Sequence, residues 1–164
     1  MDKTNQNLAE AFAGESQANR RYLAFAEKAD KEGFPQIARL FRAAAEAETI
    51  HAHNHLRALK AVKGTAENLK EAIAGETSEF REMYPPMIAA AHAEGHKEAE
   101  RTFNYANAVE KIHAQLFEKA LATMAEKKLV EIYVCPTCGY TVEEEPPDNC
   151  PVCNAKKQFF RRIE

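Results

Sequence analysis

The stretch ETIHAHNH, residues 48–55, places three histidines two residues apart in a segment with helical periodicity. Successive residues of an α-helix are rotated by about 100°, so positions i and i+2 point to nearly opposite sides. His51 and His53 therefore cannot serve one site, whereas Glu48 and His51 lie on one face. The same Glu-x-x-His spacing returns in EKIH, residues 110–113. This repeat favours a site with two related halves over a zinc-binding His-x-x-x-His pair.

Helix breakers divide roughly the first 128 residues into four long segments with helical periodicity. The expected breaks are DKEGFP (30–35), KGT (63–65) and EGH (94–96). Thr65 is the expected N-cap of the third helix, and Pro85 and Pro86 should kink or break that helix. Four long helices with short connections predict a mainly α fold, an antiparallel four-helix bundle.

The inward face of every expected helix is apolar except near its middle, where carboxylates interrupt it. These carboxylates belong to Glu15, Glu48, Glu76, Glu79 and Glu110. A buried, unpaired carboxylate costs several kcal/mol, so such a core requires compensation. Solvated glutamates would explain any one of them, but not their presence on all four helices. One Glu from each of two helices, with Glu-x-x-His from the other two, is the ligand set of ferritin-like di-iron proteins.

One glutamate exceeds that ligand set, because GETSE (75–79) supplies both Glu76 and Glu79 on one face. Five carboxylates exceed the charge of two ferrous ions by one and fall one short of two ferric ions. A neutral ligand therefore suits the reduced pair, and an added carboxylate suits the oxidised pair. We hypothesise that Glu79 and His51 compete for one iron as its oxidation state changes. The alternative is that Glu79 only accepts hydrogen bonds from groups around the ligands.

All four cysteines lie near the C-terminus, in the two knuckles CPTCGY (135–140) and CPVCNA (150–155). Paired Cys-x-x-Cys knuckles predict a tetrahedral site for zinc or for a single iron, since a reducing compartment disfavours disulfides. Aromatic residues nearby can exclude water and favour a redox iron: Tyr133, Tyr140, Phe159 and Phe160. A structural zinc ribbon remains the alternative.

Composition changes near residue 129, from Ala, Glu, Lys and Leu to short runs of Val, Tyr, Cys and Pro. We therefore predict a helical domain with its linker at 1–133 and a four-cysteine domain at 134–164. The net charge of −3 over 164 residues suggests neither a nucleic-acid partner nor a membrane partner. The polar N-terminus lacks the apolar core of a signal peptide, so cytoplasm is the expected compartment.

Taken together, these motifs resemble the rubrerythrin family, in which a ferritin-like di-iron bundle precedes a rubredoxin-like domain. The resemblance covers the whole chain and is carried by GESQANRRY, EAETIH, GETSEFREMYP, EKIH and the two knuckles. It implies that the di-iron ligands are Glu15, Glu48, Glu76, Glu79, Glu110 and His113, with His51 exchanging against Glu79. It also implies a rubredoxin-type iron held by Cys135, Cys138, Cys150 and Cys153. Tyr22 and Tyr84 match tyrosines that hydrogen-bond the carboxylates.

By the same resemblance, the chain is expected to be a peroxidase that reduces hydrogen peroxide to water. Electrons would pass through the four-cysteine iron from a rubredoxin or an NAD(P)H-dependent flavoprotein reductase, and the protein would be a homodimer. A ferroxidase or di-iron oxidase that uses dioxygen is the rival enzyme. A non-enzymatic iron-binding protein with a structural zinc ribbon is the rival binding protein.

Overall fold

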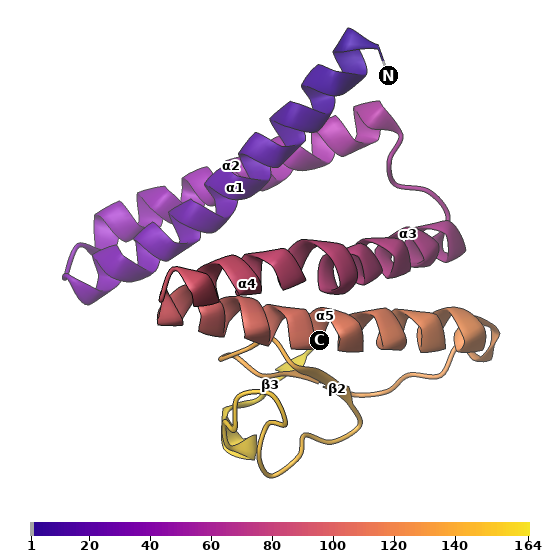
Figure 1. The fold of residues 1–164 in the computed structure, drawn as a ribbon. Coiled ribbons are helices and arrows are strands. Elements are labelled where there is room, and N and C mark those ends of the chain that lie inside the picture. Colours follow the sequence, from indigo (N-terminus) through magenta and orange to yellow (C-terminus); the bar gives the residue numbers. More distant parts are fainter. Residues whose placement is uncertain (1) are drawn as a thin grey trace. The chain divides into compact units, whose positions relative to one another are not determined.

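The computed structural model describes residues 2–164 and divides into two compact units, Met1–Lys63 and Gly64–Glu164 (Figure 1). The helices are α1 (Lys3–Lys31), α2 (Pro35–Leu59), α3 (Thr65–Ser78), the π-helix η1 (Glu79–Met83), α4 (Tyr84–Ala93), α5 (Lys97–Thr123), and the 3-10 turns η2 (Met124–Glu126) and η3 (Lys157–Phe159). The strands are β1 (Ile132–Val134), β2 (Thr141–Glu143) and β3 (Arg161–Ile163).

The first unit is an antiparallel hairpin of α1 and α2 (Figure 1). Asp2 caps α1 by accepting a hydrogen bond from the Asn5 backbone N–H at 2.8 Å. Gly33 adopts φ +81° in the turn, where a side chain would be strained, and Pro35 opens α2. Alanines pack where the two helices meet, so the backbones can approach closely: Ala26, Ala29, Ala38, Ala45 and Ala52 are buried.

In the second unit, α3, η1 and α4 form one interrupted helix that packs against α5. The predicted interruption near Pro85 is confirmed. Neither Pro85 nor Pro86 has a backbone N–H to donate, and the preceding turn is a π-helix in which the Tyr84 N–H reaches the Glu79 carbonyl. The predicted N-cap of α3 is wrong by one residue, because Gly64 is the cap and Thr65 is the first helical residue. Glu67 accepts the Gly64 N–H at 3.4 Å and so supports the helix start from its side chain.

The C-terminal part of the second unit is a small antiparallel sheet with strand order β2-β1-β3. Its cysteine knuckles lie at turns, where Gly139 and Asn154 take positive φ angles of 85° and 63°. The sheet packs against α5: Lys119 pairs with Glu143, and a Cβ on Gly139 would lie 3.7 Å from Val109 Cγ1. The predicted fold class, mainly α with a small four-cysteine domain of short strands and loops, is confirmed. No helix within residues 2–164 combines the length and apolarity needed to cross a bilayer.

Candidate metal centres

The first cluster of candidate ligands lies in the α1–α2 hairpin. Glu15 comes from α1, and Glu48 and His51 come from consecutive turns of α2. His51 Nδ1 is 2.8 Å from Glu48 Oε2 and 4.0 Å from Glu15 Oε1. Two carboxylates and one imidazole therefore offer donor atoms to one point, which is the donor chemistry that iron and zinc accept.

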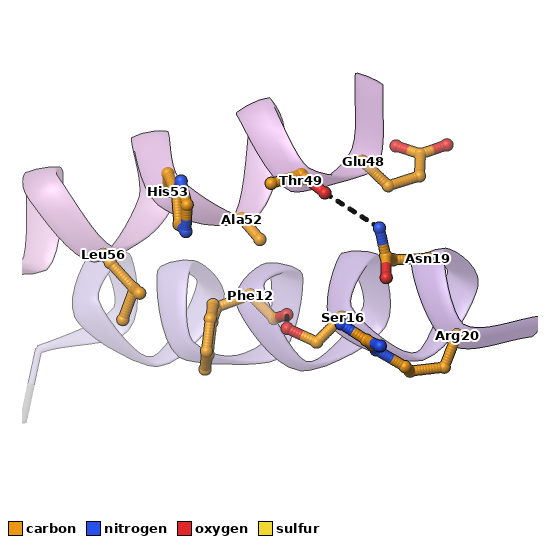
Figure 2. A pocket seen from close by; sticks show the side chains of 9 residues that line it. All are labelled: Phe12, Ser16, Asn19, Arg20, Glu48, Thr49, Ala52, His53 and Leu56. Carbon is orange, nitrogen blue, oxygen red and sulfur yellow. Dashed lines mark hydrogen bonds between the residues drawn. The ribbon is translucent and has the colours of Figure 1, made fainter. Parts of the chain in front are cut away.

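Asn19 fixes the two helices one turn from this cluster (Figure 2). Its buried side-chain amide donates to the Ala45 carbonyl at 2.7 Å and to Thr49 Oγ1 at 2.8 Å. These bonds set the rotation of α2 against α1 and so help direct Glu48. Asn19 was not predicted as a site residue, although a polar residue four positions after Glu15 in an alanine-rich interface was an available signal.

The other two histidines of ETIHAHNH lie outside the cluster. His53 is exposed and lines a cavity of about 250 Å³ together with Phe12, Ser16 and Arg20 (Figure 2). His55 is half-buried, consistent with a packing role. Only His51 of the three meets carboxylates of both helices.

The second cluster repeats this geometry in the other unit. Glu76 comes from α3, and Glu110 and His113 come from α5. His113 Nδ1 is 2.9 Å from Glu110 Oε2 and 3.8 Å from Glu76 Oε1. The repeated spacing in the sequence thus corresponds to two nearly identical three-residue clusters, one in each unit.

The four cysteines form the third cluster. Sγ–Sγ distances are 3.5 Å for Cys135–Cys153 and 3.5 Å for Cys138–Cys150, far beyond a disulfide bond of about 2.05 Å. Four sulfurs about 2.3 Å from a tetrahedrally bound metal lie about 3.8 Å apart, so the cluster is close to the size such a metal requires. Burial raises the pKa of Cys135, but hydrogen bonds from the backbone N–H groups of Thr137 and Cys138, together with those from the thiols of Cys153 and Cys138, outweigh it and lower the pKa to about 7. The donor set and its size therefore fit a tetrahedral metal.

Comparison with known proteins decides the family. The rubrerythrin family model matches residues 6–121, and the model of the rubrerythrin rubredoxin-like domain matches residues 133–161. The chain belongs to the rubrerythrin family. It is a di-iron redox protein. The chain carries the donor residues for both predicted cofactors, a di-iron carboxylate centre and a four-cysteine iron site.

Individual relatives cover almost the whole chain. Rubrerythrin-2 of Clostridium acetobutylicum is 43% identical, with 94% of this chain and 93% of the relative covered. Nigerythrin of Nitratidesulfovibrio vulgaris is 33% identical, with 98% and 86% covered. A solved structure of nigerythrin in a mixed-valence state superimposes with a TM-score of 0.61 at 32% identity, covering 99% of this chain and 88% of that one.

Glu79 and Tyr84 flank the second cluster without belonging to its three closest donors. Burial and then the charge of Glu110 raise the pKa of Glu76, against the opposing effect of His113. Burial and the charge of Glu76 raise the pKa of Glu79. Burial and the negative charges of the neighbouring glutamates raise the pKa of Tyr84 and keep its hydroxyl protonated at neutral pH. These glutamates are Glu110, Glu79 and Glu76.

Tyr22 has a different setting in the first unit. Its ring packs against Phe25 and Phe41, with centroids 6.3 Å away in each case. Its aromatic packing is therefore evident, and the hydrogen bond to a carboxylate that the resemblance implies stays a prediction.

One contact of the second cluster was not expected from the sequence. His113 Nε2 lies 2.9 Å from Oγ1 of Thr141, at the start of β2. The two residues are 28 positions apart, and no local spacing relates them. Together they border a cavity of about 370 Å³ between α5 and the sheet.

Proposed function

We propose that this chain is an oxidoreductase that reduces hydrogen peroxide to water. The observation that carries the proposal is the union, in one chain, of two Glu/Glu/His clusters, a further glutamate beside one of them, and a four-cysteine site. A storage protein or a simple ferroxidase does not need the four-cysteine site. When bound, an iron pair supplies the two electrons that convert peroxide to water, and the four-cysteine iron supplies single electrons to replace them.

The chain's own residues supply the proton chemistry. Converting one hydrogen peroxide into two waters consumes two protons as well as two electrons. Glu79 has a raised pKa and lies near the second cluster, which suits it to hold a proton and give it to a departing oxygen. The protonated hydroxyl of Tyr84 is a hydrogen-bond donor beside the same glutamates. Both groups would act in a partly dehydrated site, where such interactions are stronger than in water.

The ligand assignment follows the donor clusters. We propose that Glu15, Glu48, Glu76, Glu110 and His113 hold the iron pair in both oxidation states. Glu79 and His51 would alternate at one iron, with the carboxylate favoured by the greater charge of the ferric state.

Glu79→Ala tests this alternation. The variant should lose iron faster than the parent protein when oxidised, and much less so when reduced, as followed by iron release to a chelator in each state. Glu82→Ala is the matched control, because Glu82 lies in the same π-helix but bonds to Ser78 on the exposed side. Equal iron loss in both states of Glu79→Ala would contradict the alternation.

Partners follow from the same proposal. Electrons would come from a rubredoxin or an NAD(P)H-dependent flavoprotein reductase, the protein would act as a homodimer, and the compartment would be the cytoplasm.

The activity is tested by anaerobic reduction of the iron-loaded protein, followed by peroxide or dioxygen in separate experiments. We expect a rubredoxin-type visible spectrum that bleaches on reduction and returns much faster with peroxide than with dioxygen. Faster return with dioxygen would make the protein an oxidase. Absence of the rubredoxin-type spectrum in iron-loaded protein would contradict the electron relay.

A further inference from the structure

His113 differs from His51 in having a hydrogen-bond partner for its second ring nitrogen, Nε2. Both histidines place Nδ1 within 2.9 Å of the glutamate three residues earlier. His113 Nε2 is additionally 2.9 Å from Thr141 Oγ1, a residue of the four-cysteine domain. Within the α1–α2 hairpin, as far as the structure describes it, the contacts of His51 are those with Glu15 and Glu48.

The direction of the His113–Thr141 hydrogen bond follows from counting protons. A threonine hydroxyl carries one hydrogen and can donate only once. Thr141 Oγ1 donates to the Gly139 carbonyl at 3.0 Å, and that oxygen can only accept. The hydroxyl must therefore accept from His113, which requires a proton on Nε2.

We propose that Thr141 is a positioning residue for the iron site: its hydroxyl holds the His113 ring with Nε2 protonated and leaves Nδ1 to bind iron. This inference rests on the proposed role of His113 as a ligand. A neutral imidazole has one N–H, so holding it at Nε2 leaves the Nδ1 lone pair for iron. A bound iron would then replace the 2.9 Å contact between Nδ1 and Glu110 Oε2. A hydrogen bond to the outer nitrogen also fixes the ring plane and strengthens the ligand.

Thr141 is itself held in place by strand pairing and by its hydrogen bond to Gly139. Thr141 pairs with Val134 in the β1–β2 ladder, and Gly139 directly follows the ligand candidate Cys138. The His113 ring is thus connected through two hydrogen bonds to the knuckle that holds the four-cysteine metal. Correct folding of that knuckle and correct orientation of His113 are coupled.

Thr141→Val is the decisive variant, because valine keeps the shape and removes the hydroxyl. In reduced, iron-loaded protein it should release iron from the carboxylate site to a ferrous chelator about 10–100-fold faster than the parent protein does. The hyperfine-shifted ring N–H resonance of His113 should exchange with solvent faster in the same sample. Thr141→Ser, which restores a hydroxyl, should recover both properties.

Lys119→Gln is the matched control. Lys119 pairs with Glu143 and is a second link between α5 and β2, but it does not touch the candidate ligands. If Thr141 only docked the two parts, Lys119→Gln and Thr141→Val would change iron release alike, and that result would overturn the proposal. Release from Thr141→Val within twofold of the parent protein would also overturn it.

Failure of this inference is separable from failure of the proposed function. His113→Ala should release iron readily if His113 is a ligand, whatever the role of Thr141. Retention of iron by His113→Ala would refute the ligand assignment, whereas loss there with full retention in Thr141→Val would refute only the positioning role. Neither measurement depends on peroxidase activity.

Discussion

At the scale of single residues, identical sequence spacing leads to different chemical surroundings. ETIH and EKIH both place a histidine Nδ1 beside the preceding glutamate, at 2.8 and 2.9 Å. Only His113 has the Thr141 hydroxyl behind it, which suits a permanent ligand. Among the described residues His51 contacts Glu15 and Glu48, which fits the alternation with Glu79 proposed above. Thus the two halves of the pseudo-repeat are equal in donor set and differ in the hydrogen bonds that their histidines make.

Glu79 should make the metal-free protein sensitive to pH. Its pKa in the folded protein is raised above the ordinary 4.5, so folding favours the protonated form. That contribution to stability is fully present below pH 4.5 and is lost as the pH rises through the folded-state value. Glu79→Gln cannot ionise, so in metal-free protein it should be more stable than the parent protein near pH 7 and similar near pH 4. Urea denaturation at both pH values checks this, and a difference independent of pH would contradict it.

At the scale of helices, packing between small residues decides where polar groups are tolerated. Asn19 is buried in the alanine-lined contact of α1 with α2 and satisfies its amide through Ala45 and Thr49. A buried amide that donates to two groups of the facing helix holds one register of the two helices, because any slip would leave its N–H groups unpaired.

Asn19→Ala should therefore destabilise the protein by about 1–3 kcal/mol, since it removes two hydrogen bonds and opens a gap. Gln17→Ala, an exposed substitution on the same helix, should change stability by no more than about 0.5 kcal/mol. Urea denaturation of metal-free protein measures both values. Equal values for the two variants would show that Asn19 does not hold the helices.

The elements were largely predictable from the sequence because their signals are local. Periodicity, Gly33 with Pro35, and the Pro85–Pro86 pair determine where helices begin, end and are interrupted. The N-cap at Gly64 was misplaced by one residue because Thr65 has the more favourable capping side chain. The π-turn was foreseen only as an interruption, because its hydrogen-bond pattern depends on tertiary packing.

The site was predictable as a donor set but not as a network. Each three-residue cluster follows from i, i+3 spacing and from the repeated glutamates, which are properties of isolated helices. The hydrogen bonds made by Asn19 and Thr141 join residues 26 and 28 positions apart, and they depend on how helices and strands of the chain pack together. Asn19 left a signal in its spacing from Glu15, but the partners of Asn19 and Thr141 could not be read from the sequence.

At the scale of the whole molecule, the ligand assignment predicts how iron should be lost when single ligands are removed. The proposed di-iron ligands include Glu15 in Met1–Lys63 and Glu110 in Gly64–Glu164, and under this assignment binding of the iron pair depends on each of them. Glu15→Ala and Glu110→Ala should therefore each deplete both irons of the carboxylate centre, while the rubredoxin-type spectrum remains. Cys138→Ser should remove that spectrum and leave the carboxylate irons in place. Metal analysis combined with visible spectroscopy distinguishes these patterns. If each glutamate variant lost only one iron, the two clusters would be independent mononuclear sites, and two-electron reduction of peroxide at an iron pair would no longer follow from this chain.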